Sequence, residues 1–225
     1  MKKLTILCLS LLCAASVSAR FNQYRAVVID TICNTPLHAI RMVADSFCYQ
    51  FQACPDSLFG WAYLGLEEER DSTKEMTREG RDVFHLQYND RQYDPKTKTG
   101  DVAIDIYVLG ARFWKDQHLG TQTHVYHPAH ADYPLTVHMT ATYSGSIIES
   151  GNFLLRMTPI SEHKTKLHYE FDLTFGRFLS LFISDKTWSN SIEWRFATIL
   201  ENLVECAETG TVQPKIRGPR PKSSK

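Results

Sequence analysis

The sequence contains none of the short motifs that mark common catalytic centres. It has no glycine-rich phosphate loop, no serine nucleophile elbow and no paired cysteine–histidine signature. No two cysteines have the spacing of a zinc ribbon. There is no internal repeat, and after the first twenty residues no apolar run is long enough to cross a membrane as a helix. These absences favour a single domain of about 190 residues, which is ample for one hydrophobic core.

Neither sign of charge is in excess over the whole chain, which has 25 basic and 25 acidic residues. The balance changes when the chain is divided. Residues 1–19 hold two of the basic residues and residues 211–225 hold five, with no acidic residue in either segment. The remaining body, residues 20–210, therefore has 18 basic against 25 acidic residues, a net charge of −7. An acidic body predicts no nucleic-acid partner, because nucleic acids are themselves strongly negative.

The first nineteen residues have the layout of a cleavable secretory signal. Lys2 and Lys3 give a short positive start, residues 4–13 form an apolar run, and residues 17–19 end in small side chains that a signal peptidase accepts. The apolar run is shorter than the roughly 20 residues of a membrane-spanning helix. We therefore predict export to the periplasm or the cell exterior, with a mature chain that begins near Arg20.

Four cysteines remain in the predicted mature chain: Cys33, Cys48, Cys54 and Cys206. In an oxidising compartment, one interpretation is a bridge from Cys48 to Cys54, which closes a short loop, with Cys33 bound to Cys206. The other interpretation is four free thiols that behave as small apolar side chains. The sequence leaves both interpretations open.

The first part of the predicted domain has the pattern of a strand followed by helices. Residues 24–31 are rich in β-branched side chains, which are typical of a strand. Thr35 then predicts a helix N-cap and Pro36 the first helical residue. Apolar residues follow at helical spacing, namely Leu37, Ile40, Ala44 and Phe47. A second short helix is predicted around residues 56–63, and the charged run 67–81 is interpreted as a solvated connection.

From residue 83 the apolar spacing changes from helical to alternating, which predicts strands. The segments with this spacing are 83–88, 102–109, 120–126, 135–148, 153–158 and 166–175, the last two joined by a hairpin turn at 161–164. In the last segment the odd-numbered residues from Leu167 to Phe175 are apolar and those between them are polar. This pattern predicts an antiparallel sheet with one dry and one wet face. Asp105, Glu170 and Asp172 are expected on the wet face, away from the apolar interior.

The last predicted element is a long helix that begins near Ser184 and Asp185 and ends at Gly210. Its apolar residues step by three or four and form one stripe, made of Trp188, Ile192, Phe196, Ile199, Leu203 and Ala207. The dry face of the sheet is the only predicted surface large enough to cover this stripe. Beyond Gly210, the Pro-, Gly- and Ser-rich basic tail predicts disorder.

This order of elements resembles the START-like superfamily, also called SRPBCC or helix-grip proteins, which includes polyketide cyclases, coenzyme Q-binding proteins and the Bet v 1 allergens. The resemblance rests on residues 24–36, on the stretch from Tyr143 through Phe153 to Phe175, and on the helix at 194–207. It implies an α+β fold in which a curved antiparallel sheet of about six or seven strands wraps around the long C-terminal helix. We assign residues 1–19 to the signal peptide, 20–210 to the helix-grip domain and 211–225 to a basic disordered tail.

The resemblance also implies a hydrophobic cavity between the sheet and the C-terminal helix. The inward-facing residues expected to line it are Ile106, Val108, Met139, Tyr143, Phe153, Tyr169, Phe171, Ile192, Phe196, Ile199 and Leu203. The same side chains are equally suited to a filled core. Tyr143 and Tyr169 carry hydroxyl groups that need partners when buried, so these two are the better candidates for orienting a ligand. No cofactor and no catalytic residue are predicted.

Three closely spaced histidines are the most unusual polar feature of the sequence. His124, His127 and His130 would have to converge on one point to bind a metal. On a strand His127 would face away from the other two, and Pro128 precludes an ordinary helix, so only a loop could bring them together. The expected interpretation is a solvated polar loop, with a metal site as the alternative.

These observations together predict an exported binding protein that holds a hydrophobic small molecule, such as a lipid, sterol, quinone or polyketide-like compound, without transforming it. One alternative is a cyclase-like or metal-dependent enzyme that uses the histidine loop. Another is an interaction protein with a filled core, whose basic tail makes peripheral contact with an anionic membrane. An open pocket favours the first prediction, converging imidazoles the second and a solid core the third.

Overall fold

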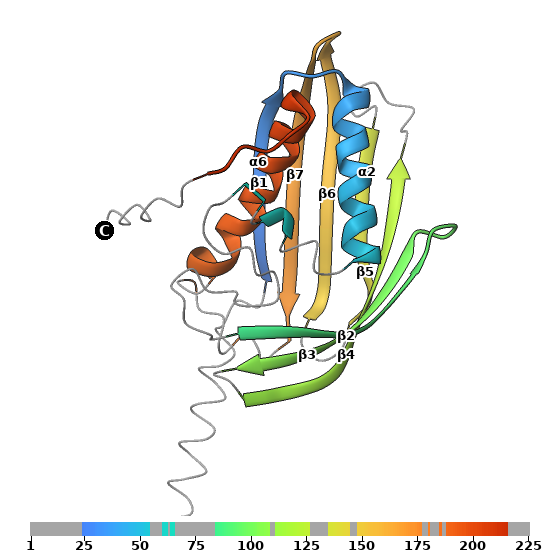
Figure 1. The fold of residues 1–225 in the computed structure, drawn as a ribbon, viewed down its shortest axis with the longest axis vertical. Coiled ribbons are helices and arrows are strands. Elements are labelled where there is room, and N and C mark those ends of the chain that lie inside the picture. Colours follow the sequence, from blue (N-terminus) through green and yellow to red (C-terminus); the bar gives the residue numbers. More distant parts are fainter. Residues whose placement is uncertain are drawn as a thin grey trace, which may run out of the picture.

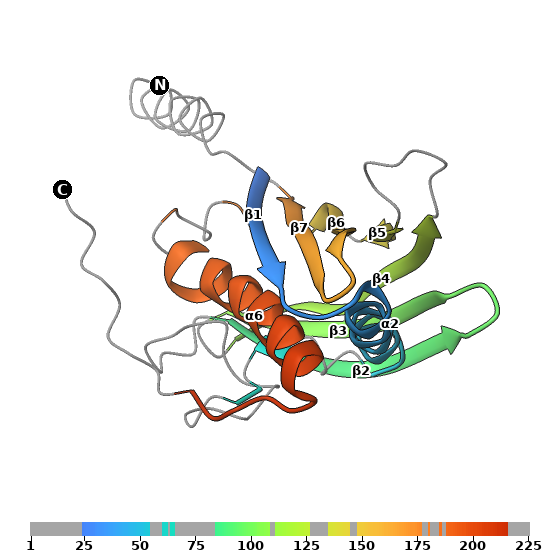
Figure 2. The ribbon, with the colours of Figure 1, turned by 90° about the horizontal axis from the view of Figure 1, so that it is seen from above.

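A seven-stranded antiparallel sheet bends around two helices in the computed structural model of the chain (Figures 1 and 2). The structure describes residues 24–54, 60–62, 64–65, 84–108, 111–126, 135–144, 148–176, 180, 185 and 188–215. Within these ranges no helix is long and apolar enough to span a membrane. The architecture is the α+β helix-grip arrangement predicted from the sequence, with seven strands.

The sheet follows the chain almost in sequence order. Its strands are β1 (Tyr24–Cys33), β2 (Phe84–Asp94), β3 (Thr99–Val108), β4 (Ala111–Tyr126), β5 (Leu135–Ser144), β6 (Ile148–Ser161) and β7 (Lys164–Phe175). They lie side by side in the order β1-β7-β6-β5-β4-β3-β2, so only β1 leaves the sequential order, by pairing with the last strand. The two-residue turn between β6 and β7 confirms the predicted hairpin.

Strand β4 is the element that the sequence pattern predicts least well. Apolar alternation predicts a strand only over 120–126, whereas the strand runs for 16 residues. Its first half has no regular alternation because its ladder with β3 is irregular. Ile104 lies opposite Gln117 but Ile106 lies opposite Trp114, so β4 carries one extra residue there. Asp116 takes up the extra length with φ at +48°, a left-handed conformation that is uncommon outside glycine.

The carboxylate of Asp105 holds this bulge. The backbone N–H of Asp116 donates to Asp105 Oδ1 at 2.8 Å, and Arg112 Nη1 donates to Oδ2 at 3.2 Å. Asp105 is on the outer face, as predicted, but it is buried rather than solvated. The hydrogen bond from Asp116, together with those from Asn89 and Arg112, holds the pKa of Asp105 below its usual range. The carboxylate is therefore part of the sheet's architecture rather than a surface charge.

Two helices lie on the concave face of the sheet (Figure 2). Helix α2 (Leu37–Ala53) buries the predicted apolar face, including Ile40, Ala44 and Phe47. Its N-cap is Pro36 and not Thr35 as predicted, because the Thr35 hydroxyl is bound to the Cys33 sulfur at 3.0 Å. Of the second predicted helix, 56–63, only a short helical piece at 60–62 falls within the described residues.

The C-terminal helix ends where predicted, at Gly210. Of its predicted start near Ser184 and Asp185, only Asp185 is among the described residues, and it is helical. A π-helical turn, η1 (Trp188–Glu193), leads into helix α6 (Trp194–Thr209). Gly210 follows with φ at +76°, and its N–H donates to the Cys206 carbonyl oxygen, which is the usual glycine C-cap. The side chains of Phe196, Ile199 and Leu203 are buried, as expected for the apolar stripe.

Substitution of Asp105 by Asn tests the role of the bulge. The depressed pKa means that ionised Asp105 stabilises the fold above the ordinary aspartate pKa of about 3.9, and that this contribution is lost as pH falls through the folded-state value. We expect Asp105→Asn to lower the free energy of unfolding by about 1–2 kcal/mol at neutral pH, since hydrogen bonds to a charged acceptor are lost. Urea unfolding at several pH values should show the difference closing in acid; a constant difference would contradict this interpretation.

Candidate functional site

The interior between the sheet and helix α6 is filled with aromatic rings. Phe196 of α6 lies flat on Phe171 of β7, with ring centroids 3.6 Å apart and an interplanar angle of 18°. Trp188 packs beside Phe196 and against Phe175 at the end of the strand. The close stacking leaves no space between this part of the helix and the sheet. The predicted cavity between the sheet and the C-terminal helix is therefore occupied by the chain's own side chains at this point.

Open space is present beside the other helix. A small pocket with a cavity volume of about 50 Å³ lies between the C-terminal end of α2 and strands β4 to β7. Its lining is almost wholly apolar apart from two threonines and one asparagine, and consists of Phe51, Leu119, Thr121, Met139, Thr140, Ala141, Ile148, Gly151, Asn152, Phe153, Phe171 and Leu173. A cavity of this size holds one end of a small molecule, such as a ring or a short stretch of chain, rather than the whole of it.

The pocket exists because two neighbouring strands separate. Strands β5 and β6 are paired from Leu135 opposite Met157 as far as Thr140 opposite Asn152, and their ladder stops there. Beyond that point β5 stays with β4 and β6 stays with β7. Leu173 packs close over Gly151 on this wall of the pocket, where an added side-chain carbon would meet it at 2.9 Å.

Of the eight predicted lining residues whose side chains the structure describes, three meet at this pocket and five do not. Met139, Phe153 and Phe171 line it. Five others are buried in the hydrophobic core and do not line it, namely Ile106, Tyr169, Phe196, Ile199 and Leu203. The side chains of Val108, Tyr143 and Ile192 lie outside the described part of the structure. Sequence reasoning missed the contribution of Phe51, Leu119, Ile148 and Leu173, because the position of the strand separation leaves no mark in the apolar alternation.

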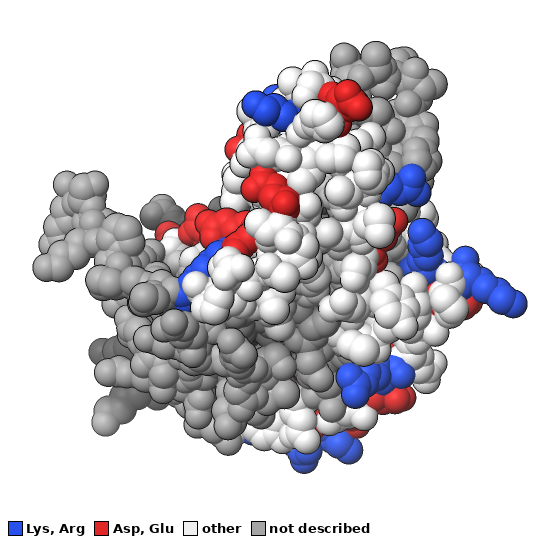
Figure 3. Space-filling model, turned by 45° about the horizontal axis from the view of Figure 1, so that its top comes forward, with Lys and Arg blue, Asp and Glu red and all other residues white. Residues whose placement is uncertain are grey.

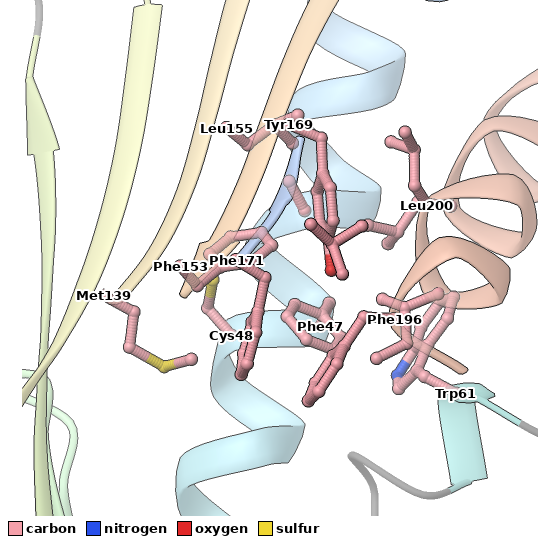
Figure 4. Packing of buried hydrophobic residues seen from close by; sticks show 14 of the residues in the cluster. Phe47, Cys48, Trp61, Met139, Phe153, Leu155, Tyr169, Phe171, Phe196 and Leu200 are labelled. Carbon is pink, nitrogen blue, oxygen red and sulfur yellow. The ribbon is translucent and has the colours of Figure 1, made fainter. Parts of the chain in front are cut away.

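Tyr169 is the one fully buried tyrosine of the described residues. Its exposed fraction is 0%, and within those residues its hydroxyl has no hydrogen-bond partner. The ring packs edge-on against Phe153 with centroids 5.5 Å apart, which places Tyr169 directly behind a wall of the pocket. In Figure 4 its hydroxyl is directed into the interior among Phe47, Phe171 and Leu200. Burial raises the pKa of this phenol far above its usual value, so the group is a neutral donor.

The polar side of the pocket leads to a second buried carboxylate. Asn152 Nδ2 donates to Asp172 Oδ1 at 3.0 Å. Asp172 lies on the outer face, as predicted, but only 8% of it is exposed. Burial raises the pKa of Asp172, the nearby charge of Glu170 adds to this, and the hydrogen bond from Asn152 opposes it. Asn152 thus connects the pocket to a carboxylate whose charged form is disfavoured.

The described residues contain no group of three or more His, Cys, Asp or Glu side chains that could hold a metal ion. His124 is half-buried on β4 and lies opposite His138 of β5 in the ladder. His127 and His130 fall outside the described residues, so convergence of the predicted trio stays a prediction. His168 contacts two carboxylates, with Nδ1 3.2 Å from Asp30 and Nε2 3.8 Å from Glu170.

All four cysteines of the domain are free thiols in the structure. Cys33 and Cys48 are buried, whereas Cys54 is exposed. Neither the Cys48–Cys54 nor the Cys33–Cys206 disulfide considered from the sequence is present. The structure therefore agrees with the other interpretation, in which the four cysteines are free thiols. Burial raises the pKa of Cys48 to about 12, so this thiol is neutral at physiological pH.

Charged side chains do not form one continuous patch on the face shown in Figure 3, where acidic and basic residues surround an uncharged middle. The first residues of the predicted disordered tail are held to the domain. Lys215 Nζ is bound to Asn202 Oδ1 at 2.7 Å and to Glu205 Oε2 at 3.1 Å. Residues 216–225 lie outside the described residues, and their predicted disorder and membrane contact stay predictions.

No family model matches the chain, and no curated protein matches it. Solved structures to which it is similar include the Zhui aromatase/cyclase from Streptomyces sp. R1128, with 9% identity, a TM-score of 0.42 and coverage of 84% of this chain and 99% of the other. A START superfamily protein from Mycobacterium smegmatis has 13% identity and a TM-score of 0.38, and the match covers 80% of this chain and 97% of the other. The ginseng major latex-like protein 151 from Panax ginseng has 7% identity and a TM-score of 0.35, and the match covers 84% of this chain and 99% of the other.

These proteins are of the kinds that the sequence pattern resembles. Because the TM-scores lie below 0.5, the likeness carries no inference about a ligand or a reaction.

Substitution of Asp172 by Asn tests the buried carboxylate beside the pocket. A raised folded-state pKa means that Asp172 favours the fold below the unfolded-state pKa, and that this contribution is lost as pH rises. We expect Asp172→Asn to be more stable than the parent at neutral pH, with the gain vanishing in acid, because the neutral amide carries no buried charge and its Oδ1 still accepts from Asn152 Nδ2. Thermal unfolding between acid and neutral pH measures this. The exposed Glu149→Gln is the matched control, and a loss of stability at neutral pH would refute the assignment.

Proposed function

We propose that this chain is a binding protein for a hydrophobic small molecule, which occupies the pocket between helix α2 and strands β4 to β7. The open apolar pocket carries the proposal, because an apolar surface of this kind left open to water is costly unless a ligand covers it. Carrying a lipid, sterol, quinone or polyketide-like compound outside the cytoplasm fits the predicted signal peptide, and export is part of the proposal.

The ligand of this site carries a hydrogen-bond acceptor at its inner end. The Tyr169 hydroxyl is fully buried and has no partner among the described residues. Leaving such a donor unsatisfied costs about 1–3 kcal/mol. A carbonyl, hydroxyl or carboxyl oxygen of the ligand would accept this hydrogen bond if Phe153, which stands between Tyr169 and the pocket, turns aside when the ligand binds. The apolar body of the ligand would remain between Met139, Phe153 and Leu173.

A binding role accounts for the pocket better than catalysis does. The polar groups on its lining are two threonines and Asn152, and none of these is an acid, a base or an activated nucleophile. The Thr121 hydroxyl is already engaged by Gln52 of α2 at 3.3 Å. Asp172 stands behind Asn152 on the outer side of the sheet and does not line the pocket.

Native mass spectrometry of the protein purified from its own compartment tests the proposal, with organic extraction and a metal assay on the same sample. We expect a stoichiometric organic adduct of lipid-like mass that is released by the solvent. A protein that carries only a metal ion, or one that carries nothing and binds no apolar probe, would contradict the proposed function.

Substitution of Tyr169 by Phe distinguishes an effect on ligand affinity from an effect on the stability of the fold. Removing the unsatisfied hydroxyl should raise the free energy of unfolding of the empty protein by up to about 1 kcal/mol. Affinity for the extracted ligand should fall about tenfold, since one hydrogen bond of about 1.4 kcal/mol is lost. Tyr107→Phe is the matched control, because the Tyr107 hydroxyl donates to Gln87 on the exposed surface. Urea unfolding and fluorescence titration measure the two effects, and unchanged affinity would show that Tyr169 does not contact the ligand.

A further inference from the structure

A buried glutamine in the last turn of helix α2 ties the helix to two parts of the sheet. Gln52 is only 4% exposed, and both ends of its side-chain amide are used. Its Nε2 donates to the carbonyl oxygen of Lys98 at 2.9 Å, in the turn between β2 and β3, and contacts Thr121 Oγ1 at 3.3 Å. Its Oε1 accepts from the Thr123 hydroxyl of β4 at 2.9 Å. The amide therefore fixes this end of α2 against β4.

The spacing between α2 and β4 is also one dimension of the pocket. Phe51, the neighbour of Gln52 in the helix, lines the pocket from one side, and Leu119 and Thr121 line it from β4. Because Gln52 is bound directly to Thr121, the hydrogen bonds that hold the helix also set the distance between these two walls. A buried amide that loses its partners is left unsatisfied, so this spacing resists change.

A glycine limits how closely the helix can approach the sheet. Gly100 of β3 lies opposite Thr121 in the ladder between β3 and β4. A side-chain carbon added to Gly100 would meet Thr121 Oγ1 at 3.1 Å, Gln52 Cβ at 3.2 Å and the Gln52 carbonyl oxygen at 3.3 Å. The last turn of α2 thus rests directly on the backbone of β3. The hydrogen bonds of Gln52 hold the helix down and this contact stops it, which fixes the width of the pocket at this end.

The pocket that results is narrow and apolar. Its volume of about 50 Å³ is well below the roughly 150 Å³ of an engineered apolar cavity that takes up benzene. Two polar side chains of its lining are already bound within the protein, Thr121 to Gln52 and Asn152 to Asp172. An unbranched chain is narrower than a ring of carbon atoms, so the pocket favours the end of a chain.

We propose that Gln52 is a positioning residue that sets the width of the pocket, and thereby selects ligands with an unbranched chain at the inserted end over ligands with a ring there. This inference rests on the proposed function, because it concerns the same pocket. It adds the shape of the ligand and points to a lipid with an acyl or alkyl chain. The acceptor proposed for Tyr169 is compatible with this shape, since a chain that carries a carbonyl or hydroxyl group is still narrow.

Two acids with twelve carbon atoms each measure this selection. Dodecanoate has an unbranched end, whereas 6-cyclohexylhexanoate has the same carboxylate and carbon number but ends in a ring. Isothermal titration calorimetry gives the ratio of their dissociation constants for the parent, Gln52→Met, Gly100→Ala and Gln50→Met. Methionine keeps the length of glutamine without its hydrogen bonds, and the alanine presses on the last turn of α2. Gln50→Met is the matched control, because Gln50 lies in the same part of α2 but is bound to Ser46 and Trp61.

We expect the parent to bind dodecanoate about tenfold more tightly than the ring-ended acid, a typical discrimination between apolar groups of different size. Gln52→Met should bring the two dissociation constants close together, and Gly100→Ala should move their ratio in the same direction by a smaller factor. Gln50→Met should keep the ratio of the parent. A merely structural role for Gln52 would weaken the binding of both acids alike and leave the ratio unchanged.

An unchanged ratio in Gln52→Met and Gly100→Ala, with both variants folded by circular dichroism, would overturn the inference. A parent that binds both acids equally would also overturn it. If Gln52→Met does not fold, Gly100→Ala alone decides, because it removes no polar group.

Failure of the proposed function looks different, since the parent would then bind neither acid. Xenon under pressure still reports on the pocket in that case, because xenon enters small apolar cavities. A larger xenon-induced shift of the Met139 methyl signal in Gln52→Met and Gly100→Ala than in the parent would support the positioning role. An equal shift in all three proteins would refute it.

Discussion

The flat contact between Phe171 of the sheet and Phe196 of helix α6 determines how the interior of the molecule is divided. With ring centroids 3.6 Å apart, it closes the space where a helix-grip cavity was expected from the sequence. The sheet still has to bend around α2, and β5 and β6 separate beside that helix. The open apolar volume is therefore displaced from α6 toward α2, while the α6 side serves as solid core.

Much of this fold could be predicted because the spacing of apolar residues along the sequence indicates which face of a strand or helix is buried. The alternation in β7 and the stripe of Phe196, Ile199 and Leu203 identify their inward residues correctly. The same pattern could not predict the first half of β4, where a bulge interrupts the alternation. It also could not distinguish a residue that fills the core, such as Ile199, from one that lines a pocket, such as Met139, because both are apolar and buried. That difference depends on where two strands separate, which is a property of the whole sheet.

Buried polar groups distinguish the parts of the interior that the chain fills by itself from the part where a ligand is proposed to bind. Asp105 is fully engaged and fixes a bulge, and Asn202 is fully engaged and joins two distant segments. Tyr169 differs from both, since its hydroxyl is buried without a partner among the described residues. A buried donor directed into an apolar interior suits a bound molecule that supplies the acceptor. This contrast connects the packing of the core to the proposed binding role.

The central claim is that an apolar ligand occupies the pocket beside α2, and three methionines allow it to be tested in one spectrum. Met139 lines the pocket, Met157 is fully buried elsewhere in the core, and Met42 is 70% exposed on α2. The measurement is a titration of protein labelled with carbon-13 at its methionine methyl groups, using dodecanoate as the probe. Our account predicts that the Met139 signal moves in a saturable way while those of Met157 and Met42 stay in place. A movement of Met157 without Met139, or no movement at all, would contradict it.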